Sequence, residues 1–207
     1  MSAKKEVHMK RAMAIAGIAV LALALVGGCV LVVTLGISSH SRSSILARAE
    51  RHYDRGVDLA GAGMKGEAAA EFDKAGWAYI DLSHWDGARA SFDRALTLDP
   101  DLAGAYEGRA TANVNLGQYE QALSDSNEAI DLDPDSAGAY YDKGLANAML
   151  GASQQAVADL KMALSLTSDR QEWAQYALED LEELKSITTD PTIITGLAEI
   201  IEQLRSE

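Results

Sequence analysis

Residues 103–136 read AGAYEGRATANVNLGQYEQALSDSNEAIDLDPDS, and this 34-residue stretch decides the fold. The same period runs three times without a gap, over residues 69–102, 103–136 and 137–170. The second and third copies both open on Ala-Gly-Ala-Tyr, and the first and second both close on Leu-Asp-Pro-Asp. A fixed period of this size indicates stacked supersecondary units, none of which buries its apolar face alone.

Each copy predicts a hairpin of two helices. In the second copy, Tyr106, Ala110 and Val114 recur every four residues and therefore share one face of a first helix. Gly117 ends that helix, because glycine accepts the left-handed conformation that a C-terminal cap needs. Pro134 ends the second helix, because proline cannot continue the hydrogen-bond ladder.

These recurring positions resemble the tetratricopeptide repeat family. Counted from the start of each copy, the family prefers aromatic residues at positions 4 and 17, small residues at 8, 20 and 27, and proline at 32. The matching residues are Phe72, Tyr106 and Tyr140; Trp85 and Tyr119; Gly76, Ala110 and Gly144; Ala88, Ala122 and Ala156; Ala95, Ala129 and Ala163; and Pro100 and Pro134. Departures from the pattern are Ser83, Ser126, Ser153 and Ser168. The resemblance implies an all-α solenoid of helical hairpins.

The repeats have helical segments on both sides. Residues 38–68 predict a helical connector, although the spacing of Gly56 and Phe72 also fits an earlier, degenerate repeat over residues 49–82. That repeat would use as its second helix the residues that open the first full copy, so we expect the two registers to exclude each other. Residues 171–207 predict two capping helices with an apolar face and an acidic outer face.

The N-terminus predicts a membrane anchor. Residues 1–11 are basic, and residues 12–37 contain no charged side chain. A helix needs about 20 apolar residues to cross a hydrocarbon core. The basic residues before this segment favour a cytoplasmic N-terminus. The repeats would then lie on the other side of the membrane, in a bacterial or archaeal envelope.

A second interpretation of the N-terminus is a processed lipoprotein. The sequence Val26-Gly27-Gly28-Cys29 resembles the lipobox of bacterial lipoprotein signal peptides, in which the cysteine becomes lipid-modified. The chain stays apolar through Ile37, which favours an anchor that is not cleaved. Both interpretations tether the repeats to a membrane.

The charge distribution excludes one class of partner. The formal net charge is -13, and from His52 onward 29 acidic residues stand against 11 Lys and Arg. A body this acidic repels phosphates, so we expect no nucleic acid partner and favour basic or apolar ones.

No motif predicts catalysis. The four histidines, His8, His40, His52 and His84, lack metal-ligand spacing, and Cys29 is the only cysteine. The chain has no phosphate-binding or dinucleotide-binding glycine motif, and the acidic run 179–183 is typical of a solvated helix face. We therefore expect no enzyme activity, no cofactor and no metal.

The resemblance implies a binding groove, lined by positions 2, 5, 9, 12 and 13 of each first helix. The residues that we select there are Asp73, Trp77, Asp81, Glu107, Thr111, Asn115, Tyr141 and Leu145, with Ile80, Val114, Ala148 and Met149 between them. Some relatives hold the C-terminal carboxylate of a chaperone with Lys and Arg at such positions, and this chain has no such cation there. Acids beside aromatic and apolar side chains suit a peptide with basic and hydrophobic residues.

Two interpretations of these side chains remain open at this stage. The aromatic residues either anchor a partner or only pack in the core, and the acids are then merely solvated. The first interpretation predicts a membrane-tethered adaptor that binds another protein. Its rivals are an envelope assembly or quality-control lipoprotein and a self-associating module, in which Trp173 and the helix 193–204 pack against a second copy.

Overall fold

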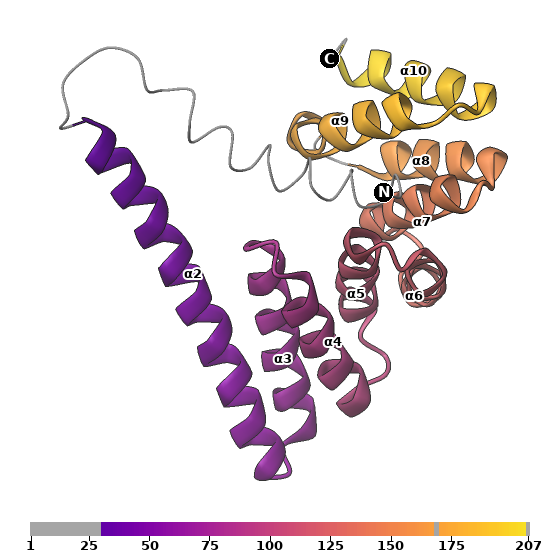
Figure 1. Cartoon of the computed structure of the whole chain (residues 1–207). Coiled ribbons are helices and arrows are strands. Elements are labelled where there is room, and N and C mark those ends of the chain that lie inside the picture. Colours follow the sequence, from indigo (N-terminus) through magenta and orange to yellow (C-terminus); the bar gives the residue numbers. More distant parts are fainter. Residues whose placement is uncertain (1–29, 168–169, 206–207) are drawn as a thin grey trace, which may run out of the picture. The chain divides into compact units, whose positions relative to one another are not determined.

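The computed structural model describes residues 30–167 and 170–205 of the chain. The elements in these residues are α-helices, drawn in chain order in Figure 1. Their bounds are α2 Val30–Gly61, α3 Lys65–Ile80, α4 Trp85–Leu98, α5 Ala103–Leu116, α6 Tyr119–Leu132, α7 Ala137–Leu150, α8 Ser153–Leu166, α9 Arg170–Ile187 and α10 Pro191–Arg205. In the described residues, the predicted all-α fold is confirmed.

The chain divides into two compact units, Met1–Ser44 and Ile45–Glu207. Of the predicted membrane span, residues 12–29 lie outside the described residues, and so does the lipidation candidate Cys29. Within residues 30–167 and 170–205, no helix combines the length and the apolar character that crossing a membrane requires. The anchor therefore stays a prediction.

Each 34-residue copy forms one helical hairpin. The hairpins are α3–α4, α5–α6 and α7–α8. Gly117 and Gly151 end α5 and α7 in the left-handed conformation, with φ of 74° and 84°. Ser83 takes the same place after α3, with φ of 56°. The departure at Ser83 therefore preserves the turn, although a side chain is strained at positive φ.

The first helices of the hairpins form one layer. α3 contacts α5, and α5 contacts α7, while α4 and α6 each pack against the first helix of the next hairpin. The residues that we selected for the groove all lie on α3, α5 and α7, or directly after α3 in the case of Asp81. The stacking of the hairpins thus brings the selected positions of three copies into the same layer.

Small residues let the helices of a hairpin approach closely. A Cβ atom added at Gly76 would lie 2.6 Å from the ring of Phe92, and one added at Gly108 would lie closer still. The Phe92 ring, which is fully buried, therefore fills the space between α3 and α5. One aromatic side chain holds two successive repeats together at this point.

α2 packs closely on α3. A Cβ atom at Gly56 would lie 2.9 Å from Phe72, and the rings of Tyr53 and Phe72 meet edge to face at 5.3 Å. Gly56 thus meets Phe72 on α3 as Gly76 meets Phe92 on α4. α3 therefore packs against α2 through Phe72 and against α4 through Gly76.

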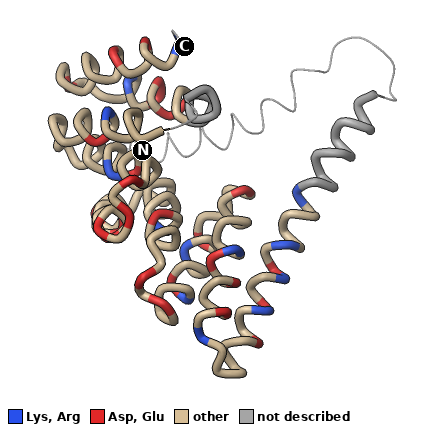
Figure 2. The backbone as a smooth tube through the Cα atoms, turned by 180° about the vertical axis from the view of Figure 1, so that it is seen from behind, with Lys and Arg blue, Asp and Glu red and all other residues tan. Residues whose placement is uncertain are grey.

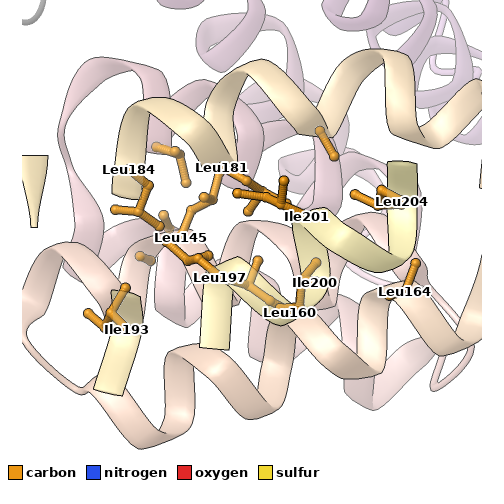
Figure 3. Close-up of a cluster of buried hydrophobic side chains, with 14 residues drawn as sticks. Leu145, Leu160, Leu164, Leu181, Leu184, Ile193, Leu197, Ile200, Ile201 and Leu204 are labelled. Carbon is orange, nitrogen blue, oxygen red and sulfur yellow. The ribbon is translucent and has the colours of Figure 1, made fainter. Parts of the chain in front are cut away.

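The C-terminal helices close the far end of the array. α10 packs against α8 and α9, and the apolar residues of these helices form one buried cluster with those of α7 (Figure 3). Ile193, Leu197 and Ile200 are at most 2% exposed. The face of α10 that self-association would need is therefore already covered within the chain. The side chain of Trp173 lies outside the described part.

Candidate peptide-binding groove

The residues that we selected on α3 have different surroundings. Trp77 is half-buried, and its ring meets Phe92 edge to face with centroids 5.6 Å apart. Asp81 is exposed, and its carboxylate accepts a hydrogen bond of 2.7 Å from Arg48 on α2. Trp77 therefore has a core-packing role whether or not it also meets a partner. Asp81 already has a cation beside it.

Asp73 is the acid of α3 that is only partly satisfied. Its side chain is half-buried, and its Oδ1 atom has no hydrogen-bond partner among the described residues. Burial raises the pKa of Asp73, and the adjacent Trp77 indole opposes that rise by hydrogen bonding to the carboxylate. This oxygen is itself shielded from solvent.

The selected residues of α5 are joined to the third copy by hydroxyl groups. Glu107 accepts a 2.6 Å hydrogen bond from Ser136, the N-cap residue of α7. Thr111 donates a 2.6 Å hydrogen bond to Asp142 on α7. The side-chain amide of Asn115 donates to the backbone carbonyl of Thr111 at 2.8 Å. The first two bonds place Glu107 and Thr111 against the third copy, and Asn115 lies one turn further along the same side of α5.

The two residues that we selected on α7, Tyr141 and Leu145, have different surroundings. The Tyr141 hydroxyl donates a 3.2 Å hydrogen bond to Asp180 on α9, so α9 lies beside this end of the row. Leu145 is only 8% exposed and belongs to the buried cluster that α9 and α10 complete (Figure 3). Leu145 therefore packs in the core, and we omit it from the binding surface proposed below.

Asp142 lies in the same layer of first helices, but we did not select it from the sequence. It is 4% exposed, and burial raises its pKa to about 8. The hydrogen bond from Thr111 opposes this rise, while the neighbouring carboxylates of Glu107 and Asp180 add to it. The sequence does contain a signal for this residue, because the third copy has an acid where the second copy has Gly108.

The basic side chains near this layer are occupied by other partners. Arg109 binds Asp125, Lys143 lies 3.9 Å from Asp159, and Lys74 binds Glu71. The hydrogen bonds to the Glu107 and Asp142 side chains come from hydroxyl groups. Acidic residues occur on each hairpin of this unit (Figure 2). The residues that we selected in this layer and directly after α3 thus include three acids, Asp73, Asp81 and Glu107, and no Lys or Arg.

No metal centre accompanies these acids in the part of the chain that the structure describes. Among those residues, no three or more His, Cys, Asp or Glu side chains are arranged to hold a metal ion. The groups that this layer offers to a ligand are carboxylates, hydroxyl groups and the rings of Trp77 and Tyr141.

Comparison with known proteins agrees with the repeat assignment. A family model described as a tetratricopeptide repeat matches residues 74–126, and one described as a TPR repeat matches residues 112–151. No curated protein shows significant sequence similarity to the chain. The family resemblance is therefore supported over the middle of the chain.

A solved structure has a similar fold. The chain is similar to the tetratricopeptide repeat domain of OM64 from Arabidopsis, with 23% identity and a TM-score of 0.50 over 69% of this chain and 98% of that one. It is also similar to the first such domain of Spaghetti (RPAP3) bound to the HSP90 peptide SRMEEVD. That match has 20% identity and a TM-score of 0.49, and it covers 69% of this chain and 96% of the other.

Proposed function

We propose that this array of tetratricopeptide repeats is a protein-interaction adaptor, which binds a segment of another protein across α3, α5 and α7. One observation carries the proposal: carboxyl groups and aromatic side chains share one layer, and the nearby cations of the repeats are engaged elsewhere. The proposed contact residues are Asp73, Trp77, Glu107, Thr111, Asn115 and Tyr141.

The charge of this layer selects the chemistry of the partner. The carboxylates of Asp73 and Glu107 would attract a basic side chain from a distance. An acidic peptide such as SRMEEVD would meet like charges at the same positions. We therefore infer that the partner segment combines Lys or Arg with a large apolar residue, which packs on Trp77 or Tyr141.

The predicted N-terminal anchor would place this binding function at a membrane. If residues 12–37 hold the chain in a bilayer, the array and a membrane partner share a thin volume. Their effective concentration then rises, so a modest affinity suffices. Lipidation at Cys29 would have the same effect. Metabolic labelling with a fatty acid tests the alternative: label that is lost in Cys29→Ser supports lipidation, and a chain that takes up no label supports the anchor.

Peptide selection tests the proposed recognition. The full chain in detergent would be presented with a displayed library of random dodecapeptides, and SRMEEVD would be measured separately. We expect enrichment of peptides with basic and large apolar residues and no binding of SRMEEVD. Either Asp73→Lys or Glu107→Lys should raise the Kd of the selected peptides by roughly tenfold or more, because each change repels the partner's cation.

The matched control is Asp131→Lys, which makes the same charge change at an exposed position on α6. It should leave the affinity within about twofold, since a distant exposed charge is largely screened. Selection of acidic peptides, or an equal loss of affinity in all three variants, would reject recognition of a basic segment by this layer. Circular dichroism should first establish that each variant is folded.

A further inference from the structure

The contact between the second and third repeats differs from the contact between the first and second. In the earlier contact, the buried ring of Phe92 lies against Gly76 and Gly108. Thirty-four residues later, the positions of these three residues are occupied by Ser126, Ala110 and Asp142. The bulky apolar side chain is thus replaced by a hydroxyl, and one of the two glycines by a carboxyl group.

The two polar side chains that stand at these positions, Ser126 and Asp142, are both buried. Ser126 is 0% exposed, and its hydroxyl has no hydrogen-bond partner within the described residues. Asp142 is 4% exposed and receives a hydrogen bond from Thr111. An unsatisfied buried hydroxyl and a buried carboxyl group contribute less to packing than an aromatic ring does. At these positions, the later contact therefore lacks the apolar burial that Phe92 provides in the earlier one.

The charges around Asp142 oppose its ionisation. α5 supplies Glu107 and α9 supplies Asp180, and both carboxylates raise its pKa. On the other packed helices, Asp125 of α6 pairs with Arg109, and Asp159 of α8 lies 3.9 Å from Lys143. The hydroxyl of Thr111 donates a hydrogen bond to the Asp142 carboxyl group but supplies no positive charge.

We propose that the contact between α5–α6 and α7 is a conformational joint, which opens when Asp142 loses its proton to water. In the closed joint the buried carboxyl group is protonated. Opening hydrates it and releases the proton, so a rise in pH favours the open form.

The expected pH window follows from two values. An Asp exposed to water has a pKa of about 3.9, and the pKa of buried Asp142 is about 8. Between these values the closed form binds one proton more than the open form. Opening therefore increases with pH throughout this window and levels off above pH 8.

Hydrogen exchange of the full chain in detergent tests the joint. Protection factors, corrected for the intrinsic effect of pH, would be compared at pH 6 and pH 8. We expect protection of the amides in α7 to fall by at least about tenfold, because the proton-linked equilibrium shifts up to about tenfold per pH unit. Protection in α4 should change little, since the side chains there are held by Phe92.

Three variants decide the interpretation. Asp142→Asn keeps an acceptor for Thr111 without a titrating proton and should abolish the pH-dependent loss of protection in α7. Asp131→Asn removes an equal charge from the exposed side of α6, and this variant should still show the pH-dependent loss of protection in α7. The triple variant Ala110→Gly, Ser126→Phe and Asp142→Gly copies the first contact and should also abolish it, which keeps the test decisive if Asp142→Asn fails to fold.

Two results would overturn the proposal. In the first, α4 and α7 lose protection in parallel, which indicates global unfolding. In the second, the pH-dependent loss in α7 persists without Asp142. Because the readout is backbone protection without any peptide, its outcome does not depend on the proposed binding function.

Discussion

Single residues in this array show where the repeat pattern is strained. Ser83 occupies a left-handed position, with φ of 56°, where the other two copies have Gly117 and Gly151. Side chains other than glycine are unfavourable there, because Cβ approaches the following carbonyl oxygen. The third residue of each Asp-Pro-Asp turn has no such strain. The departure at Ser83 is therefore a local cost within an otherwise regular hairpin.

Replacing this serine should stabilise the protein. We expect Ser83→Gly to raise the free energy of unfolding by about 0.5–1 kcal/mol, because the gain at positive φ exceeds the entropy lost by the more flexible residue. Chemical denaturation monitored by circular dichroism measures it. Ser83→Ala, which retains a Cβ atom, serves as the control and should give no gain. Equal effects of both variants would refute the strain argument.

A second residue-scale feature is the ion-pair network of Arg109. This side chain binds Asp125 through two hydrogen bonds of 3.0 and 2.6 Å and Asp93 through one of 2.7 Å. The side chain of Asp125 is 8% exposed, and that of Asp93 is 54% exposed. Asn113 also donates to Asp125, at 2.9 Å. The same arginine thus has one buried and one exposed partner.

Because only one of these two partners is buried, we expect their removal to lower the free energy of unfolding by very different amounts. Asp125→Ala should lower the free energy of unfolding by about 3 kcal/mol, because it leaves the half-buried guanidinium and the buried Asn113 amide without their acceptor. Asp93→Ala should cost less than about 1 kcal/mol, since that carboxylate is exposed. Urea denaturation of both variants gives the comparison. A similar cost for both would contradict the weight that we give to burial.

At the scale of elements, close helix packing depends on which glycines face a neighbour. A Cβ atom at Gly144 would lie 2.7 Å from the Leu160 side chain and 3.1 Å from its backbone nitrogen. A Cβ atom added at Gly104 would have no other atom within 4 Å. Both glycines are helical, in α7 and α5. Only the first is needed for the approach of two helices.

Alanine at these two positions should have opposite effects. Gly144→Ala should lower the free energy of unfolding by about 1–3 kcal/mol, because α7 and α8 must move apart. Gly104→Ala should raise it by about 0.5 kcal/mol, because alanine is the better helix former. Thermal unfolding of the two variants, followed at 222 nm, checks the signs. A gain in both would show that the helices accept the extra carbon.

The hairpins were predictable because their signals are local and repeat with the period. Gly117, Gly151 and Pro134 mark helix ends in the sequence, and the structure has helices that end beside them. The double packing of α3 was not predictable, since two overlapping registers fit the same residues. The burial of Asp142 and Leu145 depends on α5, α9 and α10, which no single repeat encodes.

For the whole molecule, the described array is covered at both ends. α2 packs on α3 through Tyr53 and Gly56, and α10 packs on α8 and α9. A repeat array needs such terminal elements, because an end repeat otherwise exposes its apolar face. The exposed layer of first helices, with its acidic and aromatic residues, is therefore a better candidate for recognition than the ends.

The C-terminal cover should be essential to stability. Leu197 on α10 is fully buried among residues of α8 and α9 (Figure 3). Leu197→Ala should lower the free energy of unfolding by about 3 kcal/mol, through lost burial and a residual cavity. Glu202→Ala, at an exposed position of the same helix, should change it by less than about 0.5 kcal/mol. Equal effects would mean that α10 is not part of the folded core.

Site-specific photocrosslinking in native membranes tests the central claim most directly. A photoreactive amino acid would be placed at Asn115 in the proposed groove, or at the exposed Gln121 on α6 as a control. Our account predicts a discrete protein partner that is captured from Asn115 and not from Gln121. Capture should be lost when Glu107→Lys is added and kept when Asp131→Lys is added. Equal capture from both positions, or capture that survives Glu107→Lys, would contradict recognition by the acidic layer of α3, α5 and α7.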